Sequence, residues 1–534
     1  MTQTEHSLPD FLSTLENEGI ALKRGSPLPP SEILAVPAAD WGRCALATKA
    51  RGLRWSAGWG EDLSGCLRIN ALLELNGRYL LLRTEVPAEK PELPSQAPHY
   101  PAADRSERHS RDLLGVRFTD HPDARRWTRH QAWAEHVHPL RKDYPASGDP
   151  SPDPDTGRQE TPPDKDYPFI QAKGAGVYEI PVGPIHAGII EPGHFRFQAV
   201  GETVLNLEER FGYVHKGIEK IAEGRDAEGL IKLAGRVSGD TAVGHAFAAC
   251  MACERAAGIE IPPRAAFLRA ILAERERIGN HLGDLGAICN DVGFAFAHYQ
   301  FGRLRENWLR DNRAVFGHRL LMDRIVPGGV NIDLDHAQVQ QLDAALTQLG
   351  RELDELLTII DRNASLGDRL YTTGVLSAAV AADLGCLGYV GRSSGQDFDV
   401  RRNAAYPPYD QLTVKVPVEE SGDVGSRFWV RYKEIRVAIR LLRVLQGRLP
   451  DGATSTKWRP PEAGAEGLGI VEGWRGETVA YVRFGEGGLI DRYFPRDPSW
   501  LNWPALEQLI LDNIVPDFPV CNKSINGSYS GADL

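Results

Sequence analysis

Residues 268–289 read LRAILAERERIGNHLGDLGAIC, and this stretch carries the pattern that decides the fold. Apolar side chains recur in it at three- and four-residue steps, which is the period of an α-helix with one buried face. The same period runs through residues 339–360, and residues 426–449 predict a third long helix. Long amphipathic helices joined by short links pack together, so we expect a helical bundle.

Short strands are predicted on both sides of this bundle. Residues 177–180 form one, and residues 195–197 and 203–205 flank a Gly-Glu turn. A last hairpin is predicted over residues 468–482, followed by a short helix near 504–513. The C-terminal part should therefore be a bundle with small flanking β-sheets.

The N-terminal part reads as α/β. Residues 66–85 alternate apolar and polar side chains on both sides of Asn76-Gly77, and such a pair predicts a hairpin because both turn residues adopt positive φ. Residues 8–18 and 39–51 are predicted as short helices. The fold class expected for the whole chain is α+β.

A segment rich in Pro, Asp, Gly and Ser separates the two parts. Residues 146–166 have too little apolar surface to bury and are predicted to be a solvated linker. The expected domains are therefore residues 1–145 and residues 167–534.

Composition excludes several classes of protein. The chain has 534 residues, 42% hydrophobic and 25% charged, which is typical of a globular protein. No apolar run approaches the ~18 residues of a membrane span, and no secretory signal is visible. A net charge of -11 argues against general nucleic-acid binding, and seven Cys indicate a reducing, cytoplasmic compartment.

Metal and nucleotide motifs are weak. Cys250 and Cys253 form a CxxC, but the other Cys are scattered and the pair lies in an Ala-rich helical stretch, which favours core packing over a metal site. His136 and His138, near His121, favour a solvated or interface role. Neither GxxxxGK[ST] nor GxGxxG occurs between a strand and a helix.

Two segments carry a more specific signal. Residues 107–118, 121–126 and 138–145 are dense in charge and resemble the signature of the hydrophilic C subunit of bacterial respiratory complex I. That resemblance implies a docking domain without a cofactor.

Residues 176–534 resemble two related families, the large subunit of membrane-bound, energy-converting [NiFe] hydrogenases of the formate-hydrogenlyase type and the D subunit of complex I. The matching motifs occur in order: Gly183–His186, Glu191–Arg196, Tyr213–Lys220, Arg236–Thr241, Ile271–Arg277, Asp291–Phe294, Arg303–Glu306, Glu472–Gly476, Asn502–Pro504 and Asp517–Pro519. The fused order of the two segments itself resembles the hydrogenlyase large subunit.

The resemblance also shows what this sequence has lost. In the hydrogenases four Cys thiolates hold Ni and Fe, and the matching positions here are Ser238, Thr241, Ser528 and Gly531. Hydroxyls do not replace soft thiolates for these metals, so we expect no [NiFe] centre. We also expect no C-terminal extension of the kind that hydrogenase maturation removes.

Inherited pocket residues are implied as well. Glu191 matches a glutamate that passes protons to the metal centre, although it would serve equally as an acceptor for loop N–H groups. Arg236 and Arg475 match arginines of the cavity wall, and buried arginines need partners. Asp240 and Asp517 are the candidate partners.

Further residues have two interpretations. His245 matches the His that follows the first metal motif, but a satisfied core His is an equal alternative. Glu274 and Glu276 would start a proton path toward a membrane partner or form a solvated or ion-paired helix face. In complex I a quinone headgroup lies between a Tyr and a His; the Tyr position falls near Val237 here, while His186 and His194 are candidates for a quinone-facing loop.

The inherited fold predicts that the two pairs of former ligands, Ser238 with Thr241 and Ser528 with Gly531, face each other across one small cavity. Glu191, Arg236 and Arg475 are expected on its wall. An acidic partner or an anion should balance the arginines, since buried charge is paired.

The resemblance implies a peripheral-arm subunit of an NADH-dehydrogenase-like, complex-I-like or hydrogenase-related oxidoreductase that couples electron transfer to ion translocation. Its expected partners are an iron–sulfur small subunit with a [4Fe–4S] cluster and antiporter-like membrane subunits, on the cytoplasmic face of the inner (plasma) membrane. This chain would hold no cofactor of its own, with quinone as a candidate ligand. The alternative is a non-redox coupling or docking module; an active hydrogenase is disfavoured by the missing ligands.

Overall fold

The computed structural model describes Leu15 and residues 19–130, 133–147, 167–188 and 190–534. The predicted helix at 8–18, apart from Leu15, and residues 148–166 of the predicted linker lie outside the described residues. The chain divides into two compact units, Met1–Pro168 and Phe169–Leu534.

The first unit is built on a five-stranded sheet with the order β1-β2-β5-β4-β3. Strands β4 (Cys66–Leu75) and β5 (Arg78–Pro87) pair antiparallel, and the turn residues Asn76 and Gly77 both have positive φ, 51° and 83°. The predicted hairpin is thereby confirmed. The remaining elements are β1 (Lys23–Arg24), β2 (Ser31–Ala35), α2 (Trp41–Ala50), β3 (Arg54–Asp62), β6 (Glu92–Pro94), α3 (Asp104–Leu114) and β7 (Arg117–Thr119).

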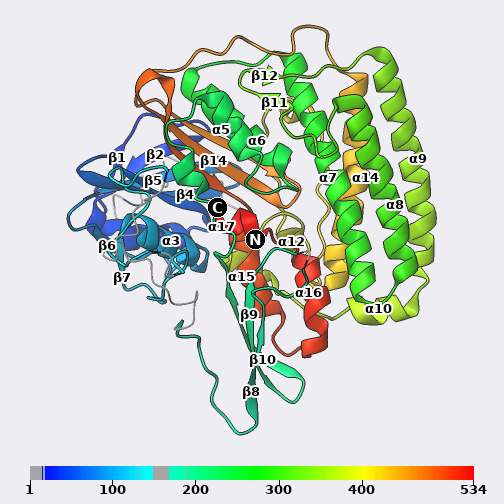
Figure 1. The fold of residues 1–534 in the computed structure, drawn as a ribbon, viewed down its shortest axis with the longest axis horizontal. Coiled ribbons are helices and arrows are strands. Elements are labelled where there is room, and N and C mark those ends of the chain that lie inside the picture. Colours follow the sequence, from blue (N-terminus) through cyan, green and yellow to red (C-terminus); the bar gives the residue numbers. More distant parts are fainter. Residues whose placement is uncertain (1–14, 16–18, 131–132, 148–166, 189) are drawn as a thin grey trace. The chain divides into compact units, whose positions relative to one another are not determined.

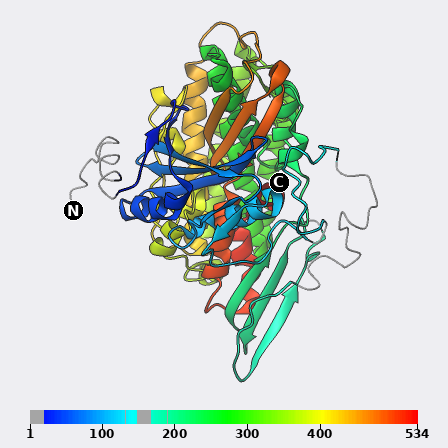
Figure 2. The same cartoon turned by 90° about the vertical axis from the view of Figure 1, so that its left-hand side faces the viewer.

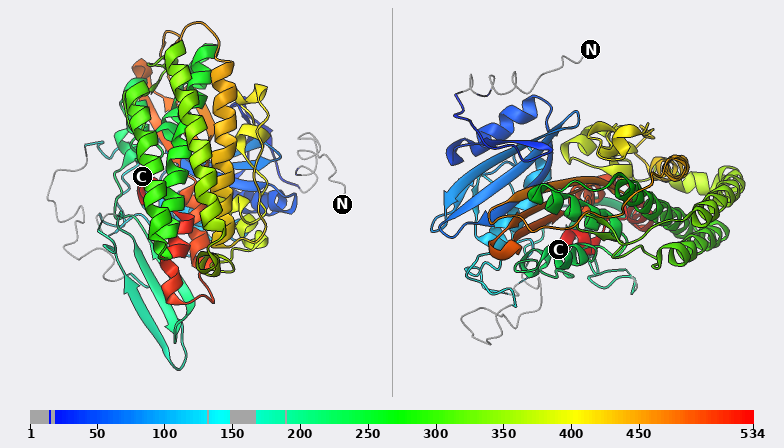
Figure 3. Two further views of the ribbon diagram at one scale, coloured as in Figure 1. Left: turned by 90° about the vertical axis from the view of Figure 1, so that its right-hand side faces the viewer. Right: turned by 90° about the horizontal axis from the view of Figure 1, so that it is seen from above.

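A bundle of long helices forms one side of the second unit. Its members are α7 (Pro263–Asp291), α8 (Ala295–Phe316), α9 (His336–Asp361) and α14 (Val424–Gly447). Each helix packs on two others, in the cycle α7, α8, α9, α14, and Figures 1 and 3 show the four running side by side. The three helices predicted from apolar periodicity are confirmed.

Side-chain caps fix where two of these helices, α9 and α14, begin. Asp335 accepts a hydrogen bond from the Gln338 backbone N–H at 2.8 Å, and the Gln338 side chain accepts one from the Asp335 N–H at 2.9 Å. This reciprocal pair satisfies two of the donors that a helix start leaves open. Asp423 caps α14 through a single bond, which its side chain accepts from the Ser426 N–H at 2.7 Å.

Two three-stranded antiparallel sheets flank the bundle, as expected. One has the order β10-β9-β8, from β8 (Val177–Val182), β9 (His194–Val200) and β10 (Thr203–Arg210), and projects from one end of the unit (Figure 2). The other has the order β13-β14-β15, from β13 (Glu466–Gly473), β14 (Gly476–Phe484) and β15 (Ile490–Arg496). The predicted hairpin around Arg475 joins β13 to β14, while β15 was not predicted.

Small residues let α6 (Ala242–Ala257) lie directly on this second sheet. A Cβ atom at Gly467 or Gly469 would lie 1.9 Å from the backbone oxygen of Ala252 or Ala248. Glycine on the strand and alanine on the helix are therefore required for the two backbones to approach so closely. This contact fixes the start of α6, next to the candidate site.

Shorter helices complete the second unit. They are α4 (Ile218–Ile221), α5 (Ala227–Ala234), α10 (Ala364–Leu370), α11 (Ala378–Asp383), α12 (Gly388–Arg392), α13 (Val400–Asn403), α15 (Ser499–Leu509), α16 (Phe518–Ile525) and α17 (Tyr529–Asp533), with the two-residue strands β11 (Ile325–Val326) and β12 (Gly329–Val330). The helix predicted at 504–513 spans Ser499–Leu509 instead, with Pro504 inside it. Among the described residues, no helix combines the length and the apolar character that crossing a membrane requires.

Candidate functional site

The two segments that carry the former ligand positions meet in the second unit. Ser238 lies in the loop before α6, and Ser528 caps the start of α17. Their hydroxyl oxygens are 2.7 Å apart, and both residues are buried. The predicted convergence of positions 290 residues apart is thereby confirmed.

Thr241 and Gly531 complete the set. The Thr241 hydroxyl oxygen donates to Asp240 Oδ1 at 3.1 Å and accepts from Arg475 Nη1 at 3.1 Å. The Gly531 N–H donates to Ser528 Oγ at 2.9 Å. All four former ligand positions therefore belong to one hydrogen-bonded cluster.

Asp497 takes up the space beside Gly531. A Cβ atom at Gly531 would lie 2.7 Å from Asp497 Cγ and 3.0 Å from Ser528 Cβ. The Asp497 carboxylate is fully buried and accepts hydrogen bonds from His245 Nε2 and from the Ser499 N–H, both at 2.8 Å. Sequence reasoning missed Asp497, which follows β15 and belongs to no motif that was singled out.

His245 is 1% exposed and bonds to Asp497. These surroundings support its interpretation as a hydrogen-bonded histidine of the core. Burial alone would raise the pKa of Asp497, but the His245 hydrogen bond and the Arg475 charge outweigh it, and the pKa is lowered. Asp497 is thus an ionised carboxylate in the centre of the site.

Arg475 and Asp240 form the main ion pair of the site. Arg475 Nη1 and Nη2 lie 2.7 Å from Asp240 Oδ1 and Oδ2, which is bidentate geometry. Burial alone would raise the pKa of Asp240, but the Arg475 charge and hydrogen bonds lower it. The predicted partnership of Arg475 with Asp240 is confirmed.

Two other predictions about the pocket wall are wrong. Arg236 is exposed, its Nη1 bonds back to the Lys232 carbonyl at 2.8 Å, and its Nη2 bonds to Asp323 Oδ2 at 2.7 Å. Its position after α5 directs the side chain along that helix and away from the cluster. Asp517 pairs with Arg369 at 3.2 Å rather than with either predicted arginine.

Glu191 is exposed, contrary to the expectation of a buried carboxylate. Its Oε2 accepts the Ser530 N–H at 2.9 Å, which confirms the alternative role as an acceptor for a loop N–H group. Lys216, within a motif that was quoted but not singled out, donates from Nζ to the Val237 carbonyl at 3.0 Å. Burial lowers the pKa of Lys216, and Glu191 acts in the opposite direction.

The two glutamates on α7 have different surroundings. Glu274 is fully buried and bonds to Arg401 Nη1 at 2.9 Å and to the Tyr409 hydroxyl at 2.7 Å. Glu276 accepts the N–H groups of Val243 and Gly244 at 2.6 and 3.0 Å and so caps the start of α6. The ion-paired interpretation is confirmed for Glu274, whereas Glu276 serves as a cap.

The two candidate histidines of the quinone-facing loop have different surroundings. His194 is buried and its Nδ1 lies 3.3 Å from the Gly183 carbonyl oxygen. His186 is half-buried, and its Nε2 lies 3.4 Å from the hydroxyl of Tyr529. Burial and the nearby Lys523 lower the pKa of His186.

The CxxC pair belongs to the core. Cys250 and Cys253 are both fully buried in α6, and burial raises the pKa of each thiol. In the part of the chain that the structure describes, no three His, Cys, Asp or Glu side chains are grouped as a metal site requires.

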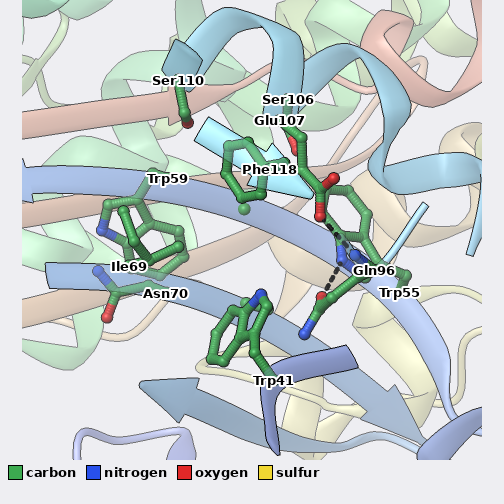
Figure 4. Close-up of a pocket in the computed structure, with 12 residues that line it drawn as sticks. Trp41, Trp55, Trp59, Ile69, Asn70, Gln96, Ser106, Glu107, Ser110 and Phe118 are labelled. Carbon is green, nitrogen blue, oxygen red and sulfur yellow. Dashed lines mark hydrogen bonds between the residues drawn. The ribbon is translucent and has the colours of Figure 1, made fainter. Parts of the chain in front are cut away.

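A very small cavity lies in the first unit (Figure 4). It measures about 10 Å³ and lies among Trp55, Trp59, Phe118 and Glu107, which is room for no more than a water molecule. Glu107 accepts the Gln96 N–H at 2.7 Å and the Ser95 hydroxyl, and burial raises its pKa to about 8. This geometry is that of a structural carboxyl group.

Three family models match the chain. Residues 53–150 match the 30 Kd subunit of respiratory-chain NADH dehydrogenase, residues 291–464 match its 49 Kd subunit, and residues 216–283 match nickel-dependent hydrogenase. The order of these matches follows the two segments described above.

Characterised relatives cover most of the chain. Formate hydrogenlyase subunit 5 of Escherichia coli K12 is 32% identical over 85% of this chain and 79% of its own length. The C/D subunit of NADH-quinone oxidoreductase from Phocaeicola vulgatus is 33% identical over 79% of this chain and 83% of its own length. A chain from the membrane-bound sulfane sulfur reductase, an archaeal respiratory membrane complex, is 25% identical with a TM-score of 0.63, over 67% of this chain and 99% of its own. The chain thus belongs to the family that unites the large subunits of energy-converting hydrogenases with the C/D subunits of NADH-quinone oxidoreductase.

Proposed function

We propose that this chain is a peripheral-arm subunit of a complex-I-like, hydrogenase-related membrane oxidoreductase that couples electron transfer to ion translocation without a [NiFe] centre of its own. The observation that carries the proposal is the hydroxyl cluster. The fold brings Ser238 to 2.7 Å from Ser528, as a ligand set requires, yet the donors there are oxygen atoms.

The donor set does not fit nickel and iron. Three positions offer neutral hydroxyls, the fourth is Gly531, and the carboxylate of Asp497 fills the remaining space. Soft thiolates select such metals, and hydroxyls bind them poorly. We therefore assign no metal chemistry to the cluster.

The residues present favour a polar, charge-balanced coupling site. The Arg475–Asp240 pair and the His245–Asp497 pair lie on either side of the hydroxyls, so a proton has several neighbouring oxygen atoms to occupy. Electrons would arrive from an iron–sulfur small subunit with a [4Fe–4S] cluster, and antiporter-like subunits would anchor the complex at the cytoplasmic face of the membrane. Quinone is the candidate acceptor, supported by the proximity of His186 to the Tyr529 hydroxyl.

The test is purification of the tagged chain from detergent-solubilised membranes of its source organism. We expect an iron–sulfur subunit and membrane subunits to co-purify, with a reduced [4Fe–4S] signal by electron paramagnetic resonance and quinone-dependent turnover. Asp240→Asn should lower turnover while the subunits stay together, and Asp323→Asn, at the exposed pair, is the matched control. A fully assembled complex that takes up no electrons would favour the rival, a non-redox coupling module, and stoichiometric nickel would refute the proposal.

A further inference from the structure

A buried arginine next to the hydroxyl cluster has no acceptor for its terminal nitrogens. Arg275, on α7, is fully buried, and its Nε donates to Asn312 Oδ1 at 2.6 Å. Its guanidinium carbon lies 3.9 Å from the ring centroid of Trp308, whose indole N–H donates to the Arg275 carbonyl at 2.9 Å. Within the described residues, neither Nη1 nor Nη2 has a hydrogen-bond partner.

These nitrogens border a cavity of about 20 Å³ between α7, α8 and the loop before α6. The other charged residues of its lining are satisfied elsewhere. Asp240 is held by Arg475, Glu276 accepts two backbone N–H groups, and Arg319 pairs with Glu306 at 2.6 Å. Arg275 is therefore the unbalanced charge of this cavity.

A buried guanidinium is costly unless it is both hydrogen-bonded and paired with an opposite charge. Burial lowers the pKa of Arg275 to about 9, and the charge of Asp311 acts in the opposite direction but forms no ion pair with Arg275 among the described residues. Burial also raises the pKa of Glu276 to about 8, which weakens the repulsion that this carboxyl group would exert on an anion.

We propose that this cavity binds one small monovalent anion of the halide class, held by the terminal N–H groups of Arg275. A water molecule would accept hydrogen bonds from Arg275 but would leave its positive charge unbalanced. An anion both accepts the hydrogen bonds and balances the charge. The size of the cavity decides the class of ligand, because about 20 Å³ admits a monatomic ion and not a tetrahedral oxyanion. In a cell this ion would be chloride, bound directly behind Asp240.

The test uses the full-length chain. Its unfolding midpoint should rise by about 1–2 °C when chloride replaces gluconate at constant ionic strength and pH 7, since a ligand that binds only the folded state stabilises it. Arg275→Met should abolish this difference, because it removes the charge and keeps a long apolar stem. Arg310→Met, at an exposed arginine of α8, should retain it.

Crystals of the wild-type chain grown with sodium bromide give a second readout that needs no variant to fold. We expect an anomalous peak beside Nη1 and Nη2 of Arg275, in contact with both. Equal unfolding midpoints in chloride and gluconate, or a water molecule without anomalous signal at that place, would overturn the proposal.

Discussion

The carboxylate of Asp497 occupies the space that any side chain at Gly531 would need, because a Cβ atom there would lie 2.7 Å from Asp497 Cγ. The space beside the four positions that were expected to match metal ligands is therefore filled by a carboxylate. Asp497 and Asp240 place two carboxylates close to Arg475 in this cluster.

This relationship predicts unequal effects of alanine at two nearby glycines. Gly531→Ala should lower the free energy of unfolding by about 1–3 kcal/mol, since overpacking forces Asp497 from its bonds to His245 and Ser499. Gly239→Ala should change it by less than about 0.5 kcal/mol, because nothing lies within 4 Å of the added carbon. Denaturant unfolding measures both, and equal effects would contradict the packing described here.

The two aspartate–arginine pairs near α6 should also differ. Asp240→Asn leaves the buried Arg475 without its charge partner, and we expect a loss of about 3 kcal/mol, at the low end for a buried pair because Asp240 keeps contact with solvent. Asp323→Asn breaks the exposed pair with Arg236 and should cost about 0–1 kcal/mol. Added salt should weaken the second effect more than the first, as thermal unfolding in a salt series will show.

Local periodicity predicted three of the four long bundle helices, whereas α8 was not predicted. Helices α7, α9 and α14 and the hairpins at Asn76-Gly77 and Arg475 follow from patterns within about 10 to 25 residues of sequence. The convergence of Ser238 and Ser528 could not follow from such patterns. It was predictable only through resemblance, which supplies the long-range geometry.

The misses share one physical cause. Arg236, Glu191 and Asp517 were placed by motif, but where a side chain points depends on the local backbone and on nearby partners such as Asp323 and Arg369. Asp497 could not be predicted as a site residue, because nothing in a single sequence distinguishes one aspartate after a strand from any other. A motif therefore does not predict whether an individual charged side chain is buried or which partner it contacts.

Glu107 in the first unit should make stability depend on pH. Burial raises its pKa from the ordinary 4.5 to about 8, so the folded protein binds the proton more tightly than the unfolded chain. This contribution to stability is complete below about pH 4.5 and is lost as pH rises through about 8. Glu107→Gln should flatten the pH dependence of unfolding over this interval, and Glu85→Gln, at an exposed carboxyl group, should leave it unchanged.

Cysteine labelling should follow burial. Cys66 is the one partly exposed Cys, and the other six are buried in the folded chain. The thiolate is the reactive form, and burial raises the pKa of Cys289 and Cys386 to about 12. Iodoacetamide at neutral pH should modify Cys66 first, as peptide mass spectrometry will show, and Cys66→Ser should be almost unlabelled until denaturant is added. Early labelling of Cys250 or Cys253 would contradict their place in the core.

Restoring thiolates should rebuild a metal site of a different kind. Ser238→Cys, Thr241→Cys and Ser528→Cys together place three sulfur atoms around one point, because Ser238 Oγ lies 2.7 Å from both Ser528 Oγ and Asp240 Oδ1, to which Thr241 also bonds. Asp497 stands where a fourth ligand would enter, and three thiolates with one carboxylate form an acceptable tetrahedral zinc site.

We expect the triple variant to bind one Zn²⁺ per chain, and Cd²⁺ in its place to give thiolate charge-transfer absorption. Adding Asp497→Asn should weaken binding by at least about tenfold, since it removes an anionic ligand. Ser238→Cys alone is the control, and a triple variant that binds zinc no better than this single one would show that the two segments do not converge as described.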